Sequence, residues 1–197
     1  VAFMAAGGVL VALAMGQLGT NALSAATGLL ELASDTNSFV LGCALPVIGR
    51  LRLQPDIAVP RLARQVSHSR PEVRFAALIA LMQYGPSASN AVPALVPALL
   101  DPDPSVRNTA LMAAARIRDS SPAMLDGLNQ ALAEPDHEVQ LLAIQALSAI
   151  GPKARGSVPR IVEVMRNNVG GLWREGRRAL QNIAPETPEA SEVLLDQ

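Results

Sequence analysis

Histidine and cysteine, the residues that most often bind metals or act as nucleophiles, are scarce in this sequence. Cys43 is the single cysteine, and the two histidines are His68 and His137. His137 precedes Glu138, but a metal site built on repeated helices needs several regularly placed His-Glu pairs. Glycine-rich phosphate loops, Ser-His-Asp orders and cysteine pairs are absent from the sequence. We therefore predict no catalytic residue, no metal and no cofactor, and expect Cys43 to be a small buried hydrophobe.

Basic side chains concentrate near the end of the chain, where they could hold an acidic segment or a phosphate group. Between Lys153 and Arg178 there are seven basic residues against Glu163 and Glu175, although the whole chain has a net charge of −1. The densest part reads WREGRR and contains Trp173, Arg174, Arg177 and Arg178. The alternative interpretation is a solvated terminal helix on which Trp173 packs as a cap.

A repeat with a period of 33 residues predicts the elements that carry these side chains. Apolar or small residues recur at offsets of 0, +4, +7 and +11, which mark one face of an α-helix. Successive copies of this second helix of each unit begin their apolar face at Val73, Val106, Val139 and Leu172. A first helix precedes each copy, with its own face beginning at Val59, Val92, Leu125 and Val158.

The turn between the two helices is best read in the stretch DPDPSVR, from Asp101 to Arg107. A residue before proline is driven out of the α-helical region, so the Asp-Pro pairs end the first helix. Asp103 is a suitable N-cap for the second helix, and Pro104 fits its first turn. We therefore expect a tight turn between antiparallel helices and not a catalytic loop. In the second helix of an earlier repeat, Pro46 is expected to produce a kink.

These turns, with RPEVR and the endings ALMQYG and ALSAIG, resemble HEAT repeats, in particular the short bacterial type first associated with phycobilisome lyases. The resemblance implies an all-α fold, a right-handed α-solenoid of about five stacked helical hairpins. It also implies an Asp–Arg ladder between adjacent repeats, which here is limited to Asp101 or Asp103 with Arg74 and Arg107. Gln140 and Trp173 replace the arginine in later copies.

The period also predicts the organisation of the chain. Residues 1–22 are expected to form the second helix of a truncated N-terminal repeat, residues 23–185 the array, and residues 186–197 an acidic tail or the start of a further repeat. The expected repeats are 24–52, 57–85, 90–118, 123–151 and 156–184. The apolar N-terminal run is an interface for self-association in this interpretation and a targeting segment in the alternative. The corresponding localisations are cytoplasmic or exported, and no membrane span is expected.

The second helices of such an array line its concave side, so their outward faces are the candidate partner-binding surface. This face lies about 200° around the helix from the buried one, two residues further along the chain. The predicted binding residues are Phe75, Ile79, Met82, Asn108, Met112, Leu141, Gln145, Trp173, Arg174 and Arg178.

The sequence thus predicts a noncatalytic scaffold that binds a protein or peptide along the concave face. One alternative is binding of nucleic acid or phosphate through the basic C-terminal repeat, which should weaken steeply with salt. A second alternative, implied by the resemblance alone, is an enzyme subunit related to bilin lyases.

Overall fold

The computed structural model describes residues 26–167, 171–188 and 190–191, and the predictions for residues 1–22 and most of 186–197 lie outside this range. The described residues contain helices and no strand. The helices are α2 (Ala26–Leu32), α3 (Ser38–Leu51), α4 (Pro55–Gln65), α5 (Pro71–Tyr84), α6 (Val92–Ala98), α7 (Pro104–Ile117), α8 (Pro122–Ala133), α9 (His137–Ile150), α10 (Val158–Arg166) and α11 (Gly171–Ile183), with 3₁₀ segments η2 (Gly85–Ala91) and η3 (Gly151–Ser157).

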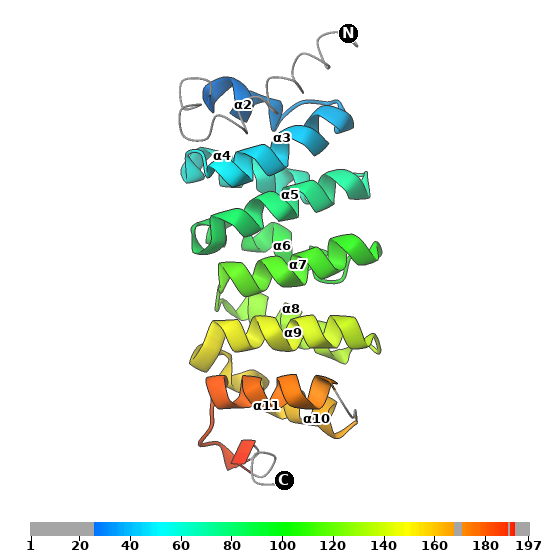
Figure 1. Cartoon of the computed structure of the whole chain (residues 1–197), viewed down its shortest axis with the longest axis vertical. Helices are drawn as coiled ribbons and strands as arrows, with labels where there is room; N and C mark the ends of the chain where they lie inside the picture. Colours follow the sequence, from blue (N-terminus) through cyan, green and yellow to red (C-terminus); the bar gives the residue numbers. More distant parts are fainter. Residues whose placement is uncertain (1–25, 168–170, 189, 192–197) are drawn as a thin grey trace.

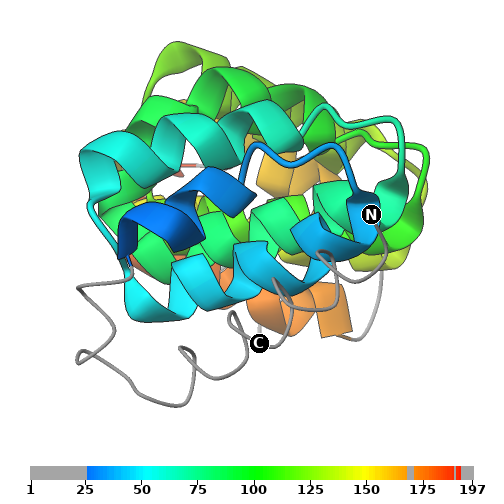
Figure 2. The ribbon, with the colours of Figure 1, turned by 90° about the horizontal axis from the view of Figure 1, so that it is seen from above.

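The helices form an elongated two-layer stack (Figure 1). The second helices α3, α5, α7, α9 and α11 lie side by side in one layer, and the first helices lie behind them. Figure 2 looks along the stack and shows successive hairpins lying over one another. Three second helices start at Ser38, Pro71 and Pro104, and 71−38 and 104−71 both equal 33, so the sequence period is also the structural period. The fold is an all-α solenoid.

One continuous interior runs between the layers, because each hairpin alone would leave its apolar side in water. The valines that begin the apolar faces of α5, α7 and α9, Val73, Val106 and Val139, are at most 1% exposed. Alanine and leucine fill most of the remaining interior, which allows neighbouring helices to approach closely. The repeat pattern therefore identifies most of the core, but Leu125, the predicted start of one first-helix face, is only half-buried, and Met124 beside it is fully buried instead.

The predicted helix start at Asp103 is confirmed. Asp103 Oδ1 accepts a hydrogen bond from the backbone N–H of Val106 at 3.1 Å, and Pro104 is the first helical residue. Asp136 caps α9 in the same way, accepting from the N–H groups of Glu138 and Val139. Side-chain caps of this kind satisfy the free N–H groups of the first turn.

The residue after the first buried valine secures the turn of its own hairpin. Arg74, Arg107 and Gln140 each donate to the carbonyl oxygen six residues earlier, at 3.0, 2.9 and 2.8 Å. Gln140 can replace arginine because an amide N–H makes the same bond to a carbonyl oxygen. This contact recurs in three successive repeats.

The ladder itself differs from the prediction. Arg74 forms two parallel hydrogen bonds with the Asp101 carboxylate, at 2.8 and 2.7 Å, as expected. Arg107 instead pairs with Asp136, at the longer distance of 3.6 Å, and reaches only the backbone oxygen of Asp101. The restriction to Asp101 or Asp103 was therefore wrong for Arg107, because its guanidinium points toward the following turn.

Two glycines allow close helix packing. A Cβ atom on Gly49 of α3 would lie 2.5 Å from the Cα atom of Ala80 in α5, so these two backbones approach directly. A Cβ atom on Gly176 of α11 would collide with the sulfur atom of Met165 in α10. Earlier repeats have alanine at the position of Gly176. In the last repeat, glycine at this position leaves room for the long side chain of Met165. This packing explains why a residue unfavourable to helices occurs within α11.

Tyr84 closes α5 at a position where later repeats have isoleucine. Its hydroxyl donates to the carbonyl oxygen of Leu53 at 2.6 Å and also lies 3.3 Å from that of Ile48. Both acceptors belong to the preceding hairpin and its outgoing turn, so Tyr84 links adjacent repeats. Burial raises the pKa of Tyr84 well above its ordinary value, because the phenolate would lose its hydration.

Substitution of Tyr84 by phenylalanine is expected to lower the free energy of unfolding by about 1–2 kcal/mol, because the Leu53 carbonyl loses a buried donor. The contribution of the Tyr84 hydroxyl to the free energy of unfolding also depends on pH. Above about pH 10 the unfolded chain releases the phenolic proton while the folded chain retains it, so stability falls as the pH rises. Urea unfolding from about pH 8 to 11 checks this, since Tyr84→Phe should reduce the alkaline loss. Equal pH profiles for the two proteins would contradict the assignment.

Candidate partner-binding surface

The outward surface of α5, α7, α9 and α11 carries the predicted binding residues, and we call it the front face. Positions that are 33 residues apart form rows across these parallel helices. One row contains Phe75, Asn108, Leu141 and Arg174, and the next, one turn along, contains Ile79, Met112, Gln145 and Arg178. The rows therefore run across the second-helix layer that Figure 1 shows at the front.

The apolar part of the front face lies on α5 and α7. Phe75 is 40% exposed and Met112 is 45% exposed, although both are large apolar side chains. Ile79 between them is half-buried. Met82 and Leu141 are also half-buried but pack against the core, so less of their surface is available to a partner. Phe75 and Met112 are therefore the strongest candidates for apolar contacts.

Polar residues continue the two rows on α7 and α9. Asn108 and Gln145 are half-buried. The Oδ1 atom of Asn108 is buried and accepts no hydrogen bond from the described residues. The centre of the front face thus combines small apolar and neutral polar surface.

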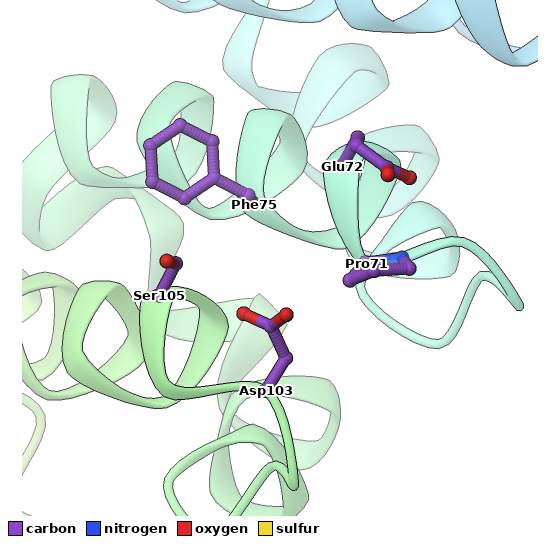
Figure 3. A pocket seen from close by; sticks show the side chains of 5 residues that line it. All are labelled: Pro71, Glu72, Phe75, Asp103 and Ser105. Carbon is purple, nitrogen blue, oxygen red and sulfur yellow. The ribbon is translucent and has the colours of Figure 1, made fainter.

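A hollow of about 290 Å³ opens beside Phe75, between the first turns of α5 and α7. Its lining residues are Pro71, Glu72, Phe75, Asp103 and Ser105 (Figure 3). Proline at the start of each helix fixes the two first turns. Figure 3 shows the Asp103 carboxylate on the side toward Phe75, whereas the carboxylate of Glu72 points away from Phe75. An aromatic wall with carboxylates at its edge is suited to an alkyl chain that ends in a cation.

The charge near this hollow is negative. The pKa of the Arg74 guanidinium is raised, first by its hydrogen bonds to Asp101 and further by the charges of Asp101, Asp103 and Glu72, while desolvation opposes the shift. Arg74 is already held by Asp101, so its charge is largely neutralised locally. Glu72 and Asp103 are the charged residues in the lining of the hollow.

The opposite end of the front face is basic. Arg174 and Arg178 lie one turn apart on α11, and both are exposed. The guanidinium of Arg177 stacks over the ring of Trp173, with the carbon atom 5.0 Å from the ring centroid. Trp173 is half-buried and packs against the core, so it supports the helix and leaves only part of its surface to a partner.

Two other basic residues of this segment do not join Arg174 and Arg178 in one patch. Arg160 and Arg166 lie on α10, in the layer of first helices behind α11. Arg160 pairs with Glu163 at 2.5 Å. Part of the positive charge counted along the sequence thus lies in the other layer of the solenoid.

The remaining reactive side chains are Cys43, His68 and His137. Cys43 is only half-buried on α3, so the expectation that it belongs to the core was wrong. His68 and His137 occur at the turn ends of two different hairpins. Within the described residues, no group of three or more histidine, cysteine or acidic side chains could hold a metal ion. No helix there is long and apolar enough to cross a membrane.

Sequence reasoning predicted Phe75 but missed the other residues that line the hollow. Glu72 and Ser105 occupy equivalent positions of the repeat, and the sequence indicates only a capping role for Asp103. The signal present in the sequence is an acidic first turn beside an outward-facing aromatic residue. The hollow forms only where the starts of α5 and α7 lie next to each other.

Comparison with known protein families identifies the family of this chain. The family model for HEAT repeats matches residues 66–148 and 92–181, which together cover more than half of the chain. The chain therefore belongs to the HEAT repeat family. A comparison with curated proteins gives no match.

Solved structures of engineered repeat proteins share the fold. One engineered protein is 25% identical, with 87% of this chain and 84% of that chain covered and a TM-score of 0.68. A second engineered protein is also 25% identical and covers 94% of this chain and 56% of its own, with a TM-score of 0.69. A designed armadillo repeat protein, solved in complex with the peptide (KR)4, is 17% identical over 88% of this chain and 90% of its own, with a TM-score of 0.68.

Proposed function

We propose that this protein is a noncatalytic scaffold that binds a peptide or protein segment across the front face. The observation that carries this proposal is the exposure of two large apolar side chains, Phe75 and Met112, on neighbouring helices of a rigid stack. Exposed apolar groups that lie together mark interaction sites more often than isolated ones. The half-buried Ile79 between them extends this patch.

The rigidity of the stack supports a binding role. The backbones of α5, α7 and α9 are held by buried alanine and leucine contacts and by the turn bonds of Arg74, Arg107 and Gln140. A face whose side chains are already in place loses little conformational freedom when a partner binds. A related fold also binds a peptide, since the designed armadillo repeat protein was solved with (KR)4.

The binding role is testable with two substitutions on the apolar patch. Peptides selected from a random display library against the immobilised protein should lose at least about tenfold in affinity when Phe75 and Met112 are both replaced by aspartate, because each loses about 1.5 kcal/mol or more of apolar contact. Fluorescence anisotropy of labelled peptides measures the change.

The matched control is Ala133→Asp, at an exposed position of α8 in the other layer. This variant should bind the selected peptides as tightly as the unmodified protein does. Selection of no peptide at all, or equal loss in both variants, would contradict a binding surface on the front face. Circular dichroism of the three proteins verifies that each remains folded.

Nucleic-acid binding is less well supported. The exposed arginines of α11 form a short row of two residues, Arg174 and Arg178, and the basic residues of α10 lie in the other layer. Phosphate backbones are bound by extended basic surfaces. The division of charge between layers therefore favours a peptide with acidic side chains over a nucleic acid at this end.

A further inference from the structure

The second helix α3 carries a row of apolar residues on the side that faces away from α5. This row, which we call the outer row, contains Phe39, Cys43 and Val47, which are spaced four residues apart and therefore follow one another along one side of the helix. Phe39 is 67% exposed, and Cys43 is half-buried. Within the described residues, no second helix lies beyond α3 on this side (Figure 1).

Later repeats show what covers this side of a second helix. The residues that correspond to Cys43 and Val47 in α5 and α7 are at most 5% exposed: Ala76, Ala80, Thr109 and Ala113. Ala80 packs against the preceding second helix, since a Cβ atom on Gly49 would lie 2.5 Å from its Cα atom. The outer row of α3 thus occupies the positions through which a second helix contacts the one before it.

Phe39 differs from the residues at its position in every later repeat. Those residues are polar or have no side chain: Glu72, Ser105, Glu138 and Gly171. A phenylalanine stabilises a helical stack only where another surface removes its ring from water. An exposed phenylalanine in this first repeat therefore indicates that α3 has a partner on its outer side.

We infer that residues 5–18 of this chain form a further second helix that covers the outer row of α3. Four second helices of 14 residues begin 33 residues apart, at Ser38, Pro71, Pro104 and His137. One period before α3 gives residues 5–18. Residues 19–25 then match the length of the seven-residue segments η2 and η3, each of which joins a second helix to the next first helix.

The composition of this segment requires a covering surface. Twenty-five residues precede α2, most of them are apolar, and none carries a charge. A helix of this composition would expose apolar side chains on every side if it stood alone in water. It is joined through Ala26 to the hairpin of α2 and α3, so the chain itself brings it to the edge where the outer row lies.

The sizes of the side chains fit the register of the later repeats. Gly49 and Ala80, which face each other between α3 and α5, are 31 residues apart in the sequence. The same separation places small residues of the segment opposite the outer row: Gly8 opposite Phe39, Ala12 opposite Cys43 and Gly16 opposite Val47. Small side chains thus face larger ones, which allows the two helices to pack closely.

The docked segment would lengthen the front face by one helix. Val9 and Leu13 lie one period before Gly42 and Pro46, which continue the two rows of the front face on α3. The apolar part of the front face would then extend from α7 across α3 to this segment. The inference itself does not depend on the proposed binding function.

Disulfide trapping with Cys43, the single cysteine of the chain, tests the inference. In the full chain with Ala12→Cys, mild oxidation should join residues 12 and 43 within one molecule. The matched control is Ala14→Cys, which corresponds to Val47 and would lie on the side of the segment away from α3. Its disulfide should form at least about tenfold more slowly, because a disulfide requires a Cα–Cα distance of roughly 4.4–6.8 Å. Mass spectrometry and non-reducing electrophoresis measure both rates.

A second variant tests the register. Adding Gly16→Leu to Ala12→Cys places a large side chain against Val47, so disulfide formation should slow by at least about tenfold. Adding Val9→Leu instead changes a position on the front face and should leave the rate unchanged. Circular dichroism verifies that each variant remains folded.

Equal rates for Ala12→Cys and Ala14→Cys would overturn the inference, as would a rate that Gly16→Leu leaves unchanged. A predominance of disulfide-linked dimers would also overturn it, because a second copy of the chain would then cover α3. None of these results bears on the selection of peptides that depend on Phe75 and Met112. The inference and the proposed function can therefore fail separately.

Discussion

Replacing Arg74 with methionine should lower the free energy of unfolding by about 3 kcal/mol, because it leaves the Asp101 carboxylate without its partner in a mostly buried place. The Arg74 and Asp101 side chains are 14% and 10% exposed, and two parallel hydrogen bonds join them. The expected loss lies at the low end for buried pairs, because Asp101 retains the N–H of Asp103 as a donor. Urea unfolding measures it.

The same substitution should also change the shape of the unfolding curve. Arg74 joins the hairpin of α4 and α5 to that of α6 and α7, and repeat proteins derive much of their cooperativity from such interfaces. We therefore expect the transition to broaden as the two sides of the interface uncouple. Arg160→Met is the control, since its exposed pair with Glu163 contributes about 0.5 kcal/mol. Similar losses in both variants would contradict the assignment to Asp101.

Replacing Gly49 with alanine should destabilise the protein by about 2–3 kcal/mol, the opposite of what helix propensity predicts. The added methyl group would lie 2.5 Å from the Cα atom and 2.8 Å from the backbone oxygen of Ala80. Backbone atoms cannot rotate away as a side chain can, so α3 and α5 must separate. Thermal unfolding followed by circular dichroism checks the result.

Gly42→Ala is the matched control, because Gly42 belongs to the same helix and has no atom within 4 Å of the added Cβ position. There the usual gain of up to about 1 kcal/mol from alanine should appear. Opposite signs in one helix would demonstrate that close approach to α5, and not helix propensity, selects glycine at position 49. Equal effects would refute this explanation.

The front face shows where prediction from sequence ends. Its positions follow from the helical period alone, which is sufficient to predict that Phe75, Met112 and Arg178 share one surface. Their exposure does not follow from the period, because a side chain on the outer face can still be covered by its neighbours. Met82 and Leu141 also occupy outward positions and nevertheless pack against the core.

The charged contacts also include some that follow from the sequence and some that depend on packing. The N-cap role of Asp103 is local and follows from the prolines and the apolar face beside it. The partner of Arg107 does not follow from the sequence, because its guanidinium can reach carboxylates of several turns and the choice depends on how the hairpins are stacked. The hollow lined by Glu72, Asp103 and Ser105 likewise exists only because α5 and α7 are neighbours.

The sequence alone thus determined the hairpin, its period, its caps and the identity of its buried face, because these depend on short-range hydrogen bonding and on the periodicity of apolar side chains. Only the tertiary structure decided which helices touch through glycine, which arginine finds which carboxylate, and where the acidic hollow opens. Those features depend on distances between residues that are about one repeat or more apart, which are fixed by packing between hairpins.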